Sequence, residues 1–201
     1  MSARLSSTPR QCTVCKAQEV FRPGARVCSL ECAAEWSNRL RARERSKALE
    51  QQRSVDRVRR EKLKPYHAWL REAQSAFNAY RREVCRIAGY RCICCGHALD
   101  WSGNKVDAGH YRSRGSAPHL RFVENNVWAQ RKQCNRWGAG RAVDYRIGLI
   151  ARIGVQAVEA LEADQASRTW SIDELKTIKL TYKNKLKALR ERKADGRLAE
   201  I

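Results

Sequence analysis

Hydrophobic residues recur every three or four positions in three long stretches of the chain, and this spacing predicts amphipathic helices. The first stretch covers residues 66–87 and ends before Gly89. The second covers residues 141–163 and is interrupted at Gly154. The third follows residues 171–174, whose Ser-x-x-Glu pattern is that of a capping box at a helix start. A mainly α-helical protein is therefore expected.

Residues 33–64 contain no such hydrophobic register. They include eleven Lys or Arg, five Asp or Glu, and no Gly or Pro. Opposite charges one turn apart favour a helix, which would be about 48 Å long at 1.5 Å per residue. Two interpretations stay open: a solvated linker, or a basic rod that lies against phosphate groups. In the second case the DNA contacts would come from Arg57, Arg59, Arg60 and Lys62.

Residues 92–137 contain shorter sequence patterns that predict a turn, a hairpin and a helix. We expect residues 105–112 and 120–123 to pair as a β-hairpin, with the turn at Gly115–Pro118. Residues 126–138 have helical character. The expected order is therefore a cysteine-bearing turn, a hairpin and a helix.

Nine cysteines need a separate explanation. The opening residues contain no apolar run typical of a secretory signal, so disulfides are not expected. Two close pairs separated by twelve residues can instead converge on one tetrahedral Zn²⁺ as four thiolates. Residue 29 would then begin a helix that carries the last ligand. These four ligands are Cys12, Cys15, Cys28 and Cys32.

Composition narrows the choice of partner. Lys and Arg number 41 against 21 Asp and Glu, a formal charge of +20. Leu, Ile, Val and Phe make up only about 19% of the chain, which argues against a large self-sufficient core. No stretch approaches the roughly 18 apolar residues of a membrane span. Nucleic acid is the partner that such a charge favours, ahead of an anionic membrane surface.

The residues best suited to chemistry lie between the predicted helices. In Asp107-Ala-Gly-His110, a neutral imidazole could activate water for phosphodiester hydrolysis. Asp107 and Asn135 could supply oxygen ligands to a hard divalent ion, Mg²⁺ or Mn²⁺. The alternative for His110 is a surface or core-packing histidine. Two basic residues shortly after it, Arg112 and Arg114, are further candidates for DNA contacts.

Several segments together resemble the NinG (Rap) family of lambdoid phages. They are CICCG, DAGHYRSRGSAPHLRF, ENNV, QCN and DYRIGLIARIG. The four-cysteine module and the basic stretch also fit, so the resemblance covers nearly the whole chain. It implies a structure-specific endonuclease that acts on Holliday junctions and other branched DNA. It also implies a central segment similar to the HNH, or ββα-metal, nucleases such as phage endonuclease VII.

Carried onto this chain, the resemblance assigns individual roles. His110 would be the general base, and Asn126 would orient the hairpin. Asp107 and Asn135 would hold the catalytic ion. The ligands of a second, structural zinc would be Cys92, Cys95 and Cys134.

Two positions depart from the family pattern. Arg131 stands where the family usually has a cysteine, and Trp128 stands where it usually has a histidine. Arginine carries only donors and cannot ligate zinc. The second zinc would then have three cysteines and water, or recruit Cys94 or His97. Trp128 can fill core space but cannot replace an imidazole in proton transfer.

These inferences combine into one expected architecture. It is mainly α-helical, with small zinc-bound modules, a long basic helix, a ββα-metal nuclease segment and a helical C-terminus. The expected parts are an N-terminal zinc module at 1–35, a basic helical linker at 36–64, a nuclease segment with its preceding helix at 65–140, and a helical region at 141–201.

The expected function is metal-dependent hydrolysis of branched DNA in phage recombination, in the cytoplasm of the bacterial host. The main alternative is a branched-DNA-binding protein whose nuclease site has degenerated. A weaker alternative is a zinc-containing RNA-binding or regulatory protein. Paired incisions across a junction would suit a homodimer, by analogy alone.

Overall fold

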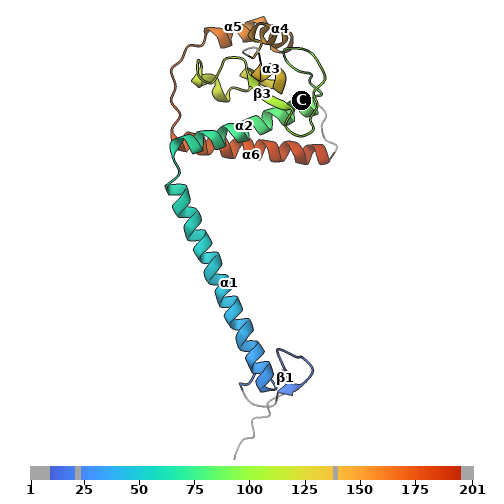
Figure 1. Ribbon diagram of the computed structural model, residues 1–201, viewed down its shortest axis with the longest axis vertical. Coiled ribbons are helices and arrows are strands. Elements are labelled where there is room, and N and C mark those ends of the chain that lie inside the picture. The colour runs from blue at the N-terminus through green and yellow to red at the C-terminus, as the bar shows by residue number, and fades with distance from the viewer. Residues whose placement is uncertain (1–9, 21–23, 138–139, 196–201) are drawn as a thin grey trace, which may run out of the picture. The chain divides into compact units, whose positions relative to one another are not determined.

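The computed structural model describes residues 10–20, 24–137 and 140–195 of the 201. Internal contacts divide the chain into two units, Met1–Lys64 and Pro65–Ile201. Figure 1 labels the elements of each unit. None of the helices in the described ranges has the length and apolar character that crossing a lipid bilayer demands.

The first unit joins a small cysteine-bearing hairpin to one long helix. Strands β1 (Arg10–Gln11) and β2 (Glu19–Val20) pair antiparallel. Helix α1 (Leu30–Lys62) follows, and the Ser29 side chain caps it by accepting a hydrogen bond from the Cys32 backbone N–H. The predicted helix start at residue 29 and the predicted basic helix are both confirmed. No α1 side chain is buried, so its stability comes from local helix energetics and surface charge pairs.

The second unit is mostly helical and encloses a two-stranded sheet. Its elements are α2 (Tyr66–Ile87), β3 (Val106–His110), the 3₁₀ helices η1 (Pro118–Phe122) and η2 (Glu124–Asn126), β4 (Val127–Arg131), α3 (Lys132–Arg136), α4 (Ala142–Ile153), α5 (Val155–Ala163) and α6 (Ile172–Ala194).

The predicted ends of the long helices are confirmed. Helix α2 ends at Ile87 with Ala88 as its C-cap, and Gly89 follows with a φ of +66°. Gly154, with a φ of +84°, separates α4 from α5. Both hydrogen bonds of the capping box at Ser171 and Glu174 are present at the start of α6. These boundaries depend on local backbone chemistry, which is why the sequence specifies them.

The predicted hairpin is only half right. Strand β3 forms as expected, but its antiparallel partner is β4, with Val106 opposite Arg131 and His110 opposite Val127. Residues 120–123 are not a strand, because Pro118 begins the 3₁₀ helix η1. Proline fixes φ near −65° and has no N–H to give to a sheet.

The predicted helix over residues 126–138 is also wrong in its first half. Residues 127–131 are strand β4, and only Lys132–Arg136 is helical, while Gly138 lies outside the described residues. Residues 127–130 are all buried, because α2 covers one side of the strand and α4 side chains lie on the other. A short strand buried on both faces has no polar alternation by which to recognise it.

The core lies on both sides of β3 and β4. Helices α2 and α6 lie side by side (Figure 1) and enclose a cluster of aromatic rings, including Phe77 and Phe122 with centroids 5.7 Å apart at 81°. The other cluster contains Trp128, Tyr145 and Leu149. The arrangement places the β3–β4 hairpin rigidly between two layers of helices.

Trp128 belongs to this core. Two guanidinium groups lie over its ring, with Arg81 4.8 Å and Arg152 4.9 Å from the centroid. Its indole N–H donates to the Asn125 carbonyl at 2.9 Å. The side chain therefore fills core space, as expected for a tryptophan at this position.

Candidate functional site

A polar pocket of about 510 Å³ lies where β3, α2 and α3 approach one another. It brings together three of the residues singled out for catalysis, Asp107, His110 and Asn135. Arg114 also lines it. The remaining lining residues are Asn78, Arg82, Ala108, Ser113, Arg136 and Gly140.

Asp107 and Asn135 meet because β4 leads directly into α3, which folds back beside β3. The Asn135 side-chain N–H donates to the Asp107 Oδ2 atom at 2.9 Å. Carboxylate and amide oxygens are hard donors of the kind that a divalent ion takes. The bond turns the Asn135 nitrogen toward Asp107, so both residues can ligate one ion only if the amide turns over.

His110 is the candidate base. Its Nε2 atom lies 3.1 Å from the Arg121 carbonyl oxygen, which can only accept a hydrogen bond. Nε2 therefore carries the proton of the neutral ring, and Nδ1 keeps its lone pair. Burial lowers the pKa of His110 to about 4; the charges of Arg114 and Arg121 act in the same direction, while hydrogen bonding to the Arg121 and Ala108 carbonyls acts against it. At neutral pH the ring is a proton acceptor.

Asn126 is not among the described residues that line the pocket. Its buried side chain accepts from the Arg112 backbone N–H at 2.8 Å and donates to the carbonyls of Arg112 and Leu120, each at 3.1 Å. These bonds tie the segment after β3 to the segment before β4. Asn126 therefore holds the hairpin and its connecting loop together.

Two arginines of this region are expected to contact DNA, and the structure places them in different surroundings. Arg114 lines the pocket. Arg112 instead donates to the Glu162 carbonyl at 3.0 Å, at the end of α5. Its guanidinium thus has a structural partner away from the pocket. Arg57, Arg59, Arg60 and Lys62 are exposed on α1, in the other unit.

The first cysteine cluster lies between the β1–β2 hairpin and the start of α1. The Sγ atoms of Cys12, Cys15, Cys28 and Cys32 all lie within 4.8 Å of one another and could hold a metal ion. The Cys15–Cys28 and Cys28–Cys32 sulfur distances are 3.5 and 3.7 Å. Burial opposes ionisation of Cys12, yet backbone N–H groups lower its pKa to about 6. The backbone thus favours the thiolate form that metals bind.

A second cysteine cluster joins the turn after α2 to α3. The sulfurs of Cys92, Cys94 and Cys134 lie within 4.8 Å of one another and could hold a metal ion. Cys95 adjoins them, with its sulfur 3.6 Å from that of Cys134. Among the described residues, His97 is not in this group; its Nδ1 lies 3.0 Å from the Cys95 carbonyl.

The structure also shows what Arg131 does in this cluster. Its backbone N–H donates to the Cys92 sulfur at 3.3 Å, while its side chain lies beside Gln133. The neighbouring Gln130 side chain donates to the Cys94 sulfur at 3.0 Å. Strand β4 therefore supplies hydrogen-bond donors to two sulfurs, as outer-shell residues do around metal-bound thiolates.

The thiols of the second cluster oppose one another's ionisation, and this arrangement suits a cation. The nearby Cys94 thiol and the Arg131 backbone N–H lower the pKa of Cys92 to about 4. The same proximity to Cys92 raises the pKa of Cys94, and burial raises that of Cys134. One thiolate thus forms easily and suppresses the ionisation of the others. A divalent cation among the sulfurs would remove this penalty.

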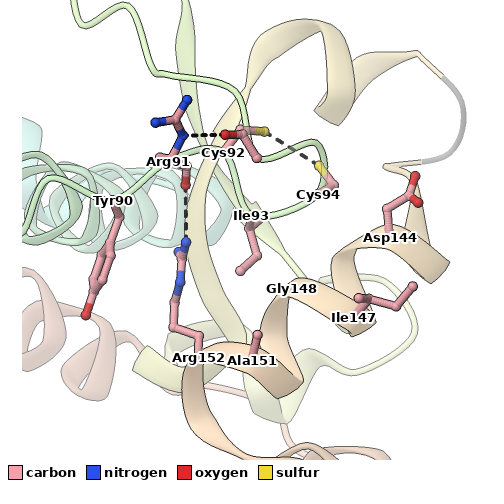
Figure 2. Close-up of a pocket in the computed structure, with 11 residues that line it drawn as sticks. Tyr90, Arg91, Cys92, Ile93, Cys94, Asp144, Ile147, Gly148, Ala151 and Arg152 are labelled. Carbon is pink, nitrogen blue, oxygen red and sulfur yellow. Dashed lines mark hydrogen bonds between the residues drawn. The ribbon is translucent and has the colours of Figure 1, made fainter.

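Helix α4 supports the second cluster from outside. A cavity of about 530 Å³ lies between this helix and the turn that carries Cys92 and Cys94 (Figure 2). At its edge Gly148 packs against the turn so closely that an added Cβ atom would lie 1.9 Å from the Ile93 carbonyl oxygen. Arg152 donates to the Arg91 carbonyl at 3.2 Å. Helix α4 therefore holds the turn in place through one close backbone approach and one side-chain hydrogen bond.

Several residues of these sites could not be singled out from sequence. Asn78 and Arg82 lie one turn apart on α2, more than twenty residues before β3, and Arg82 and Arg136 are two of 41 basic residues. The available signal was their place on the polar face of an amphipathic helix. The sequence indicates Cys94 only as one of two possible substitutes for a zinc ligand at position 131.

The described molecule is a strongly basic, mostly helical protein with two cysteine clusters that could each hold a metal ion and a polar pocket containing histidine, aspartate, asparagine and arginine. The family model described as "Bacteriophage Lambda NinG protein" matches residues 5–192, and the chain belongs to this NinG family.

Individual relatives match over almost their whole length. "Protein ninG" of Salmonella phage P22 is 37% identical over 94% of this chain and 98% of its own. "Protein ninG" of Escherichia phage lambda is 37% identical over 93% and 96%, and that of Escherichia phage 933W is 36% identical over 93% and 96%. No solved structure matches the chain significantly.

Proposed function

We propose that this protein is a metal-dependent endonuclease that cuts Holliday junctions and other branched DNA during phage recombination. The observation that carries the proposal is the shared pocket of Asp107, His110 and Asn135. Membership of a phage family and the formal charge of +20 support the same conclusion.

In this mechanism, the Nδ1 atom of His110 accepts a proton from a water molecule. The water oxygen forms a bond to phosphorus while the bond from phosphorus to the leaving sugar oxygen breaks. Asp107 and Asn135 would hold Mg²⁺ or Mn²⁺, which when bound neutralises charge on the phosphate and the leaving oxygen. Arg114 and the pocket's other guanidinium groups orient the phosphate.

We further propose that each cysteine cluster holds a structural Zn²⁺ ion. Sulfur donors in fours are typical of such zinc sites. A tetrahedron with Zn–S bonds of about 2.3 Å has edges of about 3.8 Å. The sulfur separations of 3.5–3.7 Å between neighbouring cysteines are close to this value. In the second cluster, Cys94 would take the place that Arg131 cannot fill.

The rival function is a protein that binds branched DNA without cutting it. The observation that favours it is the small donor set of the pocket, in which Asp107 is the single carboxylate among the described lining residues. This rival predicts junction binding with no metal-dependent nicks.

Incubation of the zinc-loaded protein with a labelled four-way junction separates the two functions. We expect nicks with Mg²⁺ or Mn²⁺ and none after chelation. The pH profile adds a sharper readout, because the ring must be neutral to accept a proton. With a pKa of about 4 for His110, cleavage should stay near its neutral rate down to about pH 5 and then fall.

The matched control is His97→Ala, which removes an exposed histidine outside the pocket and should leave this profile unchanged. A loss of cleavage centred near pH 6.5, the ordinary value for histidine, would contradict the lowered pKa of His110.

A further inference from the structure

One face of α2 carries basic and polar side chains that lead into the pocket. Arg71, Ser75, Asn78 and Arg82 are spaced four, three and four residues apart. At 100° per residue this spacing places them on a single stripe. We call these four residues the α2 stripe. Its last two members line the pocket, and its first two are exposed.

The acidic residues of α2 lie on another side of the helix. Glu72 bonds Lys179 of α6 at 2.8 Å, and Glu83 bonds Arg86 within α2. Among the described residues, Arg71 and Arg82 form no ion pair with any carboxylate. The α2 stripe is therefore purely basic and polar, and its guanidinium groups can bind an external anion.

The charge of the pocket agrees with a phosphate ligand. Arg82, Arg114 and Arg136 line it from three different segments, against the one carboxylate of Asp107. A guanidinium offers two parallel N–H donors that match two phosphate oxygens. Three such groups around one pocket suit a phosphodiester.

The length of the α2 stripe indicates more than one phosphate. Arg71 and Arg82 are eleven residues apart, which is about 16 Å along a helix axis. Successive phosphates of one DNA strand advance by roughly 3.4 Å along the duplex axis. The α2 stripe therefore spans several nucleotides of one strand.

We propose that the α2 stripe binds the sugar–phosphate backbone of the strand that is cut. Arg82 contacts the phosphate at the reacting position, and Arg71 contacts a phosphate further along the same strand. This inference rests on the proposed endonuclease function, and it adds the path of the substrate strand and the residues that fix it.

The two arginines should have different effects. Arg71→Gln should weaken junction binding and reduce the salt slope by about 0.9, the loss of one phosphate contact, and should lower the cleavage rate at saturating protein less than Arg82→Gln does. Arg82→Gln should also lower that saturating rate, by at least about tenfold, because the reacting phosphate is less well held. Arg82→Lys should restore part of the binding but not the rate.

The experiment measures junction affinity across a salt series in chelator, then single-turnover cleavage with Mg²⁺ or Mn²⁺. Arg192→Gln is the matched control: it makes the same change at an exposed α6 position away from the pocket. Thermal unfolding verifies that each variant is folded.

The outcomes are distinguishable from those of the proposed function. Salt slopes and rates of both α2 variants equal to those of Arg192→Gln, in a protein that cleaves, would overturn the α2 stripe and leave the endonuclease intact. Reduced slopes in a protein that never cleaves would support phosphate binding by the α2 stripe, refute the nuclease activity, and overturn the assignment of a cut strand.

Discussion

Replacing Gly148 with alanine tests whether α4 packs directly on the turn of the second cysteine cluster. An added Cβ atom would lie 1.9 Å from the Ile93 carbonyl oxygen and 3.0 Å from its carbon. Carbon contacts are favourable at about 3.5–4.0 Å, so the helix or the turn must move by more than about 1 Å. The obstacle is backbone, which cannot rotate away as a side chain does.

The expected magnitude follows from two opposing terms. Overpacking a core costs about 1–3 kcal/mol or more, and this overlap is severe. Alanine is favoured over glycine inside a helix by about 1 kcal/mol. We therefore expect a net loss of about 2 kcal/mol, which lowers the Tm by roughly 5–10 °C for a unit of this size.

The assay is thermal unfolding together with the zinc retained against a chelator. Gly115→Ala is the control, because its Cβ atom would find only the Ser113 hydroxyl, 3.8 Å away. Gly148→Ala should release the zinc of the second cluster earlier while the first cluster stays loaded. A Tm equal to or above that of the parent, as helix propensity alone predicts, would refute the packing argument.

Two further predictions concern metal content and DNA affinity. Cys94→Ser should lower the zinc content from two ions per chain to one, and adding Arg131→Cys should restore it, since either thiolate can complete the site. Atomic absorption measures the zinc content of both variants. An unchanged zinc content in the single variant would remove Cys94 from the ligand set. Glutamine at four α1 positions should weaken binding to every DNA form and reduce the slope of log affinity against log salt concentration by about 0.9 per lost phosphate contact. Fluorescence anisotropy measures this slope. An unchanged slope would make α1 a solvated linker. The four positions are Arg57, Arg59, Arg60 and Lys62.

The helices could be predicted because their signals are local. Hydrophobic spacing defined α2, and Gly89, Gly154 and the Ser171 cap defined helix ends. Strand β4 could not be found in this way, because burial on both faces removes the alternation that identifies a strand. Its pairing with β3 depends on tertiary packing, because α2 and α4 cover the two faces of the strand.

The same contrast between local signals and tertiary packing holds for the residues of the sites. Asp107, His110 and Asn135 were singled out because their residue types and neighbours suggest hydrolysis, and the fold brings them into one pocket. Arg82 gave no such signal, since one arginine among many is marked only by where its helix packs. In the same way Cys-x-Cys-Cys spacing does not say which sulfurs converge, because the turn geometry decides that Cys94 faces Cys92.

The central claim is that His110 acts as the base in cleavage of branched DNA. Its most direct test is single-turnover cleavage of a labelled four-way junction by the parent and by His110→Ala, compared at equal zinc content and equal junction occupancy. The account predicts metal-dependent nicks by the parent and a rate at least about 100-fold lower in the variant, with binding unchanged. Equal rates in the two proteins, or no cleavage by the zinc-loaded parent in Mg²⁺ and in Mn²⁺, would contradict it.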